Sequence, residues 1–140
     1  IMEYNDSNLE LVSNTIRSSL GPDLLPKRMN STWEIRAKQS KWFGHCHTAS
    51  AVLRRIFGKE NITLYRGLDD SDIYHWWAED LNGKRIDLTS EQYTEHGLEP
   101  PYEKAEKSSP LGFSSYRKRV DLLEQRVLAK LNGESAITFE

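Results

Sequence analysis

The chain has 140 residues, with 19 Lys and Arg against 21 Asp and Glu, which gives a formal net charge of -2 at pH 7. That balance excludes the strongly basic surface by which proteins bind nucleic acids. No apolar run approaches the roughly 18 residues of a membrane span, and no secretory signal opens the chain, so we expect a cytoplasmic protein with no membrane partner. The length predicts a single domain over 1–140, with a core over about 7–131 and a tail over 132–140 that is either mobile or a short edge strand.

Cys46 is the only cysteine. A disulfide within the chain and a cysteine-rich zinc site are therefore excluded. A lone thiol is most often a small buried hydrophobic group, so its neighbours decide whether it has a chemical role.

Three helices are expected in the first half of the chain. Apolar residues at helical spacing predict one over 7–20, opened by a capping box at Ser7. A second capping box predicts a short helix that begins at 31–34. The clearest pattern covers 46–57, where an apolar stripe faces the core and a glycine follows. Cys46 lies in the first turn of that helix, at the edge of the stripe.

The second half begins with strands. Period-two alternation predicts three of them, over 61–66, 73–80 and 84–89. A turn at 81–83 joins the last two as a hairpin. One helical turn is expected at 90–93, then a long loop over 95–112 that we interpret as a substrate lid or a partner surface, and a last helix over 114–131. The order of helices, strands and helix indicates an α+β domain.

Three residues carry useful chemistry in this order: Cys46 at a helix start, His75 in a strand and Asp87 in the next strand. A thiol is nucleophilic as the thiolate, and the first turn of a helix favours that form through its dipole and its free amides. The same amides suit a developing oxyanion. An imidazole serves as base and acid, and a carboxylate orients it. We therefore predict a Cys-His-Asp triad.

The hairpin turn decides whether this triad can form. With a two-residue turn, His75 and Asp87 point to opposite faces of the sheet. With a three-residue turn and a left-handed Gly83 in a bulge, Asp80 pairs with Lys84. His75 and Asp87 then become diagonal neighbours on one face. The triad therefore requires the bulge.

Further residues near the thiol are candidates for substrate or oxyanion binding: Gln39, Trp42, Gly44, His45, His47 and Trp77. The Gln39 amide is a candidate oxyanion donor, and Gly44 lets a substrate backbone approach closely. The tryptophans either line a cleft or fill the core. One histidine of the 45–47 stretch is expected to be solvated and the other to contact substrate or backbone. We expect no metal and no cofactor, because neighbouring side chains at a helix start diverge and no pair is spaced i, i+4.

Several short blocks resemble the YunG-like family of small bacterial and phage proteins: Gly44-His45-Cys46, 48–53, His75-Trp76-Trp77, 86–93 and 116–127. The resemblance spans about 33–130. More distantly, the order of Cys, His-x-Trp and Asp-Leu-Thr is similar to the papain-like and transglutaminase-like cysteine superfamily. That resemblance implies a central Cys-bearing helix on a small antiparallel sheet, with flanking N- and C-terminal helices.

The same resemblance implies roles for the triad, with Cys46 as nucleophile, His75 as general base and then acid, and Asp87 as the orienting group. Two positions depart from the patterns. His45 stands where the YunG-like pattern has Gln, and Gln39 lies one position further from the thiol than the papain-like Gln does.

We expect a cysteine-dependent hydrolase or acyltransferase that acts on an amide or ester carbonyl of a peptide, a protein or a small molecule and needs no cofactor. One alternative is a non-catalytic binding or inhibitor module, phage-encoded, that keeps the fold; burial of Cys46 would favour it. A less favoured hypothesis is a metal-dependent hydrolase that uses His45, His47 and His75.

Overall fold

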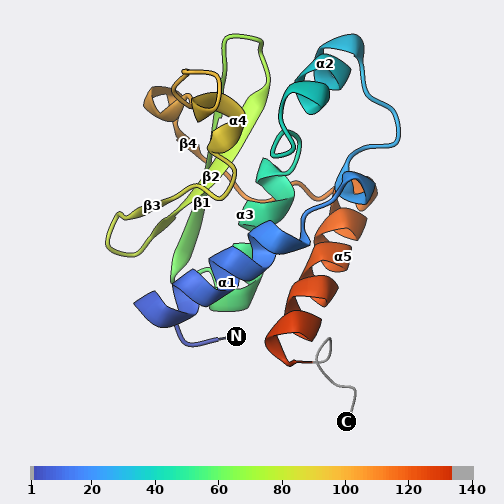
Figure 1. Ribbon diagram of the computed structural model, residues 1–140. Coiled ribbons are helices and arrows are strands. Elements are labelled where there is room, and N and C mark those ends of the chain that lie inside the picture. The colour runs from blue at the N-terminus through green and yellow to red at the C-terminus, as the bar shows by residue number, and fades with distance from the viewer. Residues whose placement is uncertain (1, 134–140) are drawn as a thin grey trace.

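The computed structural model describes residues 2–133 (Figure 1). The expectation for the tail after residue 133 lies outside the described residues. The helices are α1 (Asp6–Ser19), α2 (Ser31–Gln39), α3 (Cys46–Phe57), α4 (Glu91–Thr94) and α5 (Ser114–Leu131), with 3-10 turns η1 (Pro22–Leu24) and η2 (Tyr102–Lys104). The strands are β1 (Ile62–Leu68), β2 (Tyr74–Asp80), β3 (Arg85–Ile86) and β4 (Glu106–Lys107). The predicted α+β class is confirmed.

The strands form one antiparallel sheet in the order β3-β2-β1-β4. Ala78 pairs with Ile86, the Gly83 amide donates to the Asp80 carbonyl over 3.0 Å, and Gly83 has a φ of 81°. The three-residue turn that the triad requires is therefore confirmed. The predicted third strand is too long, because the ladder ends at Ile86 and Asp87 lies just beyond it.

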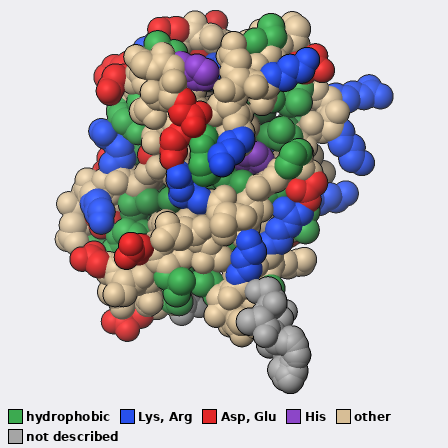
Figure 2. All heavy atoms as spheres, viewed as in Figure 1, with side chains coloured by type: hydrophobic (Ala, Val, Ile, Leu, Met, Phe, Trp, Pro, Cys, Tyr) green, Lys and Arg blue, Asp and Glu red, His purple; other side chains and the backbone are tan. Residues whose placement is uncertain are grey.

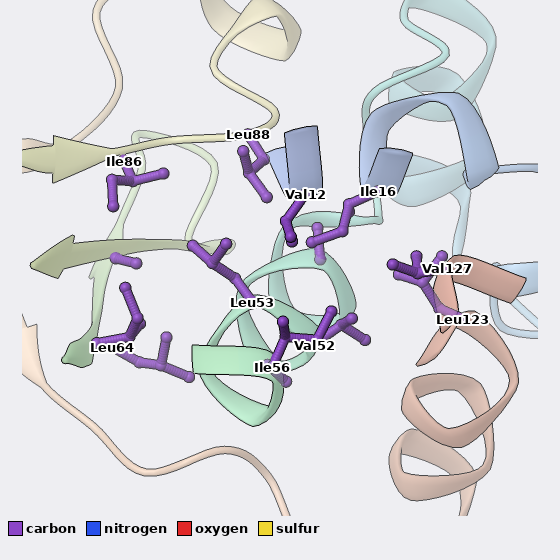
Figure 3. Packing of buried hydrophobic residues seen from close by; sticks show 14 of the residues in the cluster. Val12, Ile16, Val52, Leu53, Ile56, Leu64, Ile86, Leu88, Leu123 and Val127 are labelled. Carbon is purple, nitrogen blue, oxygen red and sulfur yellow. The ribbon is translucent and has the colours of Figure 1, made fainter. Parts of the chain in front are cut away.

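α3 is the central helix of the fold. It contacts β1 and β2 on one side and α1 and α5 on the others (Figure 1). Val52 and Leu53 are completely buried; Leu53 points toward the sheet, and side chains of α5 such as Leu123 approach α3 from the opposite side (Figure 3). The apolar side chains of α3 are therefore buried against the sheet on one side and against helices on the other. This packing fixes the helix, and with it the position of Cys46 in its first turn.

Asparagines cap α1 and α2, ahead of the serines that we expected to do so. The side chain of Asn5 accepts from the Asn8 amide over 2.8 Å, and that of Asn30 accepts from the Trp33 amide over 2.9 Å. Both predicted capping boxes are therefore wrong, although both helices are present. An Asn side-chain oxygen reaches the amide three residues further along as well as a Ser hydroxyl does, so each cap lies one or two residues before the predicted serine.

The 95–112 segment is more ordered than the predicted loop. It contains η2 and β4, and β4 pairs with β1 at the edge of the sheet. Its backbone also lies directly on Gly67, where an added Cβ would be 2.6 Å from the Pro101 carbonyl oxygen. Prolines and glycines in the segment suggest a loop, but they carry no information about a partner strand elsewhere in the chain.

No helix within residues 2–133 is long and apolar enough to cross a membrane. Figure 2 shows Lys and Arg interspersed with Asp and Glu on the face it presents, in keeping with the formal net charge of -2.

Candidate active site

Cys46 is the first residue of α3 and lines a pocket of about 230 Å³. The residue is 8% exposed, and its Sγ lies 3.9 Å from the Tyr74 carbonyl oxygen. The first hydrogen bond within the helix runs from the Ala49 amide to the His45 carbonyl, so the amides of residues 46–48 precede the helical ladder. The thiol therefore sits at the positive end of the helix dipole, beside backbone amides that are free to bind an anionic oxygen.

The imidazole of His75 is held rigidly inside the fold. His75 lies in β2 and is completely buried. The Trp77 ring stacks on it at 5.7 Å between centroids, and the Tyr93 ring meets it edge-on at 4.9 Å. Its Nε2 lies 2.7 Å from Asp87 Oδ2. The carboxylate engages Nε2, so the other ring nitrogen, Nδ1, points away from Asp87.

Opposing effects set the pKa of His75. Burial lowers the pKa, but the hydrogen bond to Asp87 and the neighbouring Cys46 thiol raise it more, and it reaches about 9. The imidazole is then protonated near neutral pH. A protonated imidazole beside the thiol is able to act as a general acid.

The Asp87 carboxylate receives three donors. His75 Nε2 and the Tyr102 hydroxyl both bind Oδ2 at 2.7 Å, and the Thr89 amide donates to Oδ1 over 3.1 Å. The Asp87 side chain is only 5% exposed, so these bonds compensate a buried charge. Tyr102 is absent from the sequence prediction, because it lies in the segment that we expected to be a loop.

Gln92 is a second residue that the sequence prediction missed. It is buried in α4, and its Nε2 lies 3.2 Å from His75 Nδ1 and 3.2 Å from Thr89 Oγ1. Its amide donates to Nδ1 when the imidazole is neutral, which places the ring proton on Nε2 toward Asp87. The available signal was its position three residues after Thr89, at the start of a predicted helical turn, from which a long side chain reaches back.

These groups lie inside a stretch that a protein family shares. The family model described as YunG protein matches residues 8–132. The chain belongs to the YunG family. The match covers Cys46, His75, Asp87, Gln92 and Tyr102, and it confirms the resemblance to the YunG-like family. No curated protein and no solved structure matches the chain significantly.

Two of the other predicted residues line the pocket of this YunG-family chain together with Cys46. Gly44 has a φ of 87°, and an added Cβ would lie 2.5 Å from Leu25 Cδ2. His47 is buried, and its Nε2 accepts from the Leu111 amide over 2.8 Å. Burial, helped by the charge of Arg119, lowers the pKa of His47 to about 4. His47 is therefore neutral and contacts backbone, one of its two expected roles.

The structure does not bring the remaining four candidates to the thiol. Trp42 and His45 line a different pocket, Gln39 is exposed and lines a third, and Trp77 is 1% exposed. Trp77 supports His75 from inside the core and has no surface for substrate. The expectation of a solvated histidine at 45–47 is wrong, because both histidines are buried; burial lowers the pKa of His45 to about 4 against the effect of Asp23.

The imidazoles do not form a metal-binding set. Among residues 2–133, no three His, Cys, Asp or Glu side chains are arranged to hold a metal ion. His45 and His47 line separate pockets, and both ring nitrogens of His75 have partners. The hypothesis of a metal-dependent hydrolase therefore has no ligand set in the described part of the chain.

Proposed function

We propose that this protein is a cysteine-dependent hydrolase or acyltransferase that acts on an amide or ester carbonyl. The observation that carries the proposal is the 2.7 Å contact between His75 Nε2 and Asp87 Oδ2, on an imidazole that also neighbours the Cys46 thiol. A thiol, an imidazole and a carboxylate in series are the parts of a nucleophilic triad. The pocket gives a small substrate a route to the sulfur.

The arrangement of α3 on the sheet supports the same function. The thiol begins the central helix, the imidazole comes from a strand that this helix covers, and the carboxylate follows the neighbouring strand. We infer from this arrangement a papain-like or transglutaminase-like core. Such a core delivers the three groups from separate rigid elements, so that their geometry does not depend on a flexible loop.

In the proposed reaction, Cys46 Sγ attacks the carbonyl carbon and forms a C–S bond. The amides of residues 46–48 donate to the oxyanion of the tetrahedral adduct. The adduct then collapses, the bond to the leaving amine or alkoxide breaks, and the leaving group takes the proton from His75 Nδ1. Water or an acceptor amine attacks the thioester and returns a proton to His75. The free acid or a new amide leaves, and the thiolate is restored.

Alkylation by iodoacetamide at pH 6 tests the activation of the thiol. We expect Cys46 to react at least about tenfold faster than free cysteine, because a helix N-terminus and a neighbouring imidazole together activate a thiol as a nucleophile. His75→Ala should remove that advantage, whereas His96→Ala, at an exposed histidine, should not. The proposal is overturned if Cys46 reacts no faster than free cysteine and His75→Ala leaves its rate unchanged.

A non-catalytic binding module is the second candidate, and burial favours it. His75 is 0% exposed and Cys46 is 8% exposed, so the imidazole has no surface of its own in the pocket. This candidate predicts slow alkylation of Cys46 at a rate that does not depend on His75. The triad proposal predicts the opposite result, so the same experiment separates the two.

A further inference from the structure

The pocket beside Cys46 combines aromatic walls with positive charge. Aromatic rings from three separate parts of the chain line it: Trp33, Tyr74, Trp76 and Tyr116. Arg66 and Arg119 also line it, and Asp72 is the one acidic residue among the described residues that do. Asp72 is exposed, so solvent screens its charge. The balance of charge around the pocket is therefore positive.

The two arginines differ in whether their guanidinium groups already have anionic partners. Arg66 stacks on the Tyr74 ring at 4.0 Å, and its Nε donates to Glu106 over 2.9 Å. Arg119 lies 4.6 Å from the centre of the Tyr116 ring and is half-buried. Within residues 2–133, the guanidinium of Arg119 has no hydrogen-bond or ion-pair partner. Its guanidinium is therefore the cationic group most free to bind an anion that enters the pocket.

The size of the pocket limits what it admits. Its volume of about 230 Å³ lies below the roughly 300–1,000 Å³ that holds a drug-sized ligand. A group of about the size of one amino-acid residue fits such a space. A folded protein would have to present an extended segment or a chain end to reach the thiol.

We propose that this pocket selects acyl donors whose acyl group carries a carboxylate, and that Arg119 binds that carboxylate. The inference rests on the proposed function, because it places the acyl group on Cys46. A planar guanidinium presents paired donors that match the two oxygens of a carboxylate. The aromatic walls, with His47 neutral behind them, supply apolar contact for the rest of the acyl group.

Comparing two alkylating reagents of nearly equal size tests the selection without requiring turnover. Iodoacetate carries a carboxylate where iodoacetamide carries a neutral amide. We expect the ratio of their rates at Cys46 to exceed the ratio for free cysteine by roughly tenfold, because one charge-assisted contact contributes about that factor. The ratio stays measurable even if both reactions are slow, so failure of the proposed function and failure of the selection give different results.

Variants of α5 assign the effect to one residue. Arg119→Gln should return the ratio to the value for free cysteine, whereas Arg119→Lys should keep most of the preference. Lys118→Gln is the matched control, since Lys118 is exposed on the same helix and does not line the pocket. Thermal unfolding checks that each variant is folded. The proposal is overturned if Arg119→Gln leaves the ratio of the two alkylation rates unchanged. It is also overturned if Arg119→Gln and Lys118→Gln lower that ratio equally.

A substrate comparison locates the carboxylate on the acyl donor. The 4-nitroanilides of glutamic acid through its α-carbonyl and through its γ-carbonyl are isomers that leave different carboxylates free. Preferred cleavage of the first supports an acidic side chain, and preferred cleavage of the second supports a chain-end carboxylate. The glutamine α-anilide has a side chain of nearly the same shape but no charge. The selection is overturned if this compound is cleaved as fast as the better of the two glutamic acid anilides. Absence of cleavage in all three counts against the proposed function, and the alkylation ratio then decides the selection by itself.

Discussion

Tyr102 donates a 2.7 Å hydrogen bond to Asp87 Oδ2, the same carboxylate oxygen that lies 2.7 Å from His75 Nε2. Its ring meets Trp77 edge-on at 5.1 Å, and the Arg85 guanidinium lies over it at 3.6 Å. Two donors on one oxygen hold the carboxylate in a single orientation toward the imidazole. The segment between α4 and α5 therefore helps to hold Asp87 in the proposed triad.

Removing the Tyr102 hydroxyl should weaken the fold and leave the ring in place. We expect Tyr102→Phe to lower the free energy of unfolding by about 1–2 kcal/mol, because a buried carboxylate loses a charge-assisted donor. Urea unfolding followed by tryptophan fluorescence measures this loss. Tyr65→Phe is the matched control: the Tyr65 ring also contacts Trp77, by stacking, and its hydroxyl has no hydrogen-bond partner within residues 2–133. Equal losses in the two variants would contradict a role for the Tyr102 hydroxyl.

Stability should fall at alkaline pH because His75 loses its proton. Although burial lowers the pKa of His75, Asp87 and Cys46 raise it to about 9 in the folded chain, above the unfolded value of about 6.5. The resulting stabilisation is complete below pH 6.5 and is lost as the pH rises through 9. We expect the free energy of unfolding to fall by about 1 kcal/mol per pH unit in that window.

Urea unfolding at a series of pH values measures this slope. His75→Gln should flatten it, and Asp87→Asn should reduce it because the imidazolium loses its buried partner. A slope of the same size in His75→Gln and in the unmodified chain would show that the proton belongs to another group.

At acid pH, the free energy of unfolding should fall as the pH decreases, because His47 is buried and neutral in the folded chain. Burial and then the charge of Arg119 lower the pKa of His47 to about 4, below the unfolded value of about 6.5. Its contribution is present above pH 6.5 and is lost as the pH falls through 4, where the Nε2 that accepts from the Leu111 amide takes a proton. We expect a loss of about 1 kcal/mol per pH unit for this proton.

Below pH 6.5, the free energy of unfolding should depend less steeply on pH in His47→Gln, by the contribution of one proton. His96→Gln, at an exposed histidine, should leave the slope unchanged. Indistinguishable slopes in these two variants would sink the assignment to His47.

Gly44 should tolerate a side chain poorly. Its φ of 87° is unfavourable for L residues, and an added Cβ would lie 2.5 Å from Leu25 Cδ2. Gly97→Ala is the matched control, because Gly97 has a φ of 71° and open space around it. We expect both variants to lose about 1–2 kcal/mol from the backbone, and Gly44→Ala to lose more from the clash. Circular dichroism melts measure the difference, and the prediction fails if the two variants melt together. Leu25→Ala should restore part of the extra loss in Gly44→Ala.

Elements with strong local patterns could be predicted from the sequence. The bounds of α3 and α5 agree with the expected 46–57 and 114–131, because an apolar face that repeats every three to four residues has only one helical register. The hairpin left two registers open, and requiring His75 and Asp87 on one face selected the one that the structure has. Chemistry and periodicity together were sufficient for that part of the site.

Local patterns were not sufficient for the rest of the site. Tyr102 reaches Asp87 only because its segment docks on the edge of β1, and Gln39 and Trp42 lie near the thiol in sequence while lining other pockets. The sequence by itself determined the helices, the hairpin and the three residue types of the triad, since these follow from short-range periodicity and from the chemistry of single side chains. Only the tertiary structure decided which groups surround the triad, because burial and pairing depend on contacts between segments whose approach no local pattern encodes.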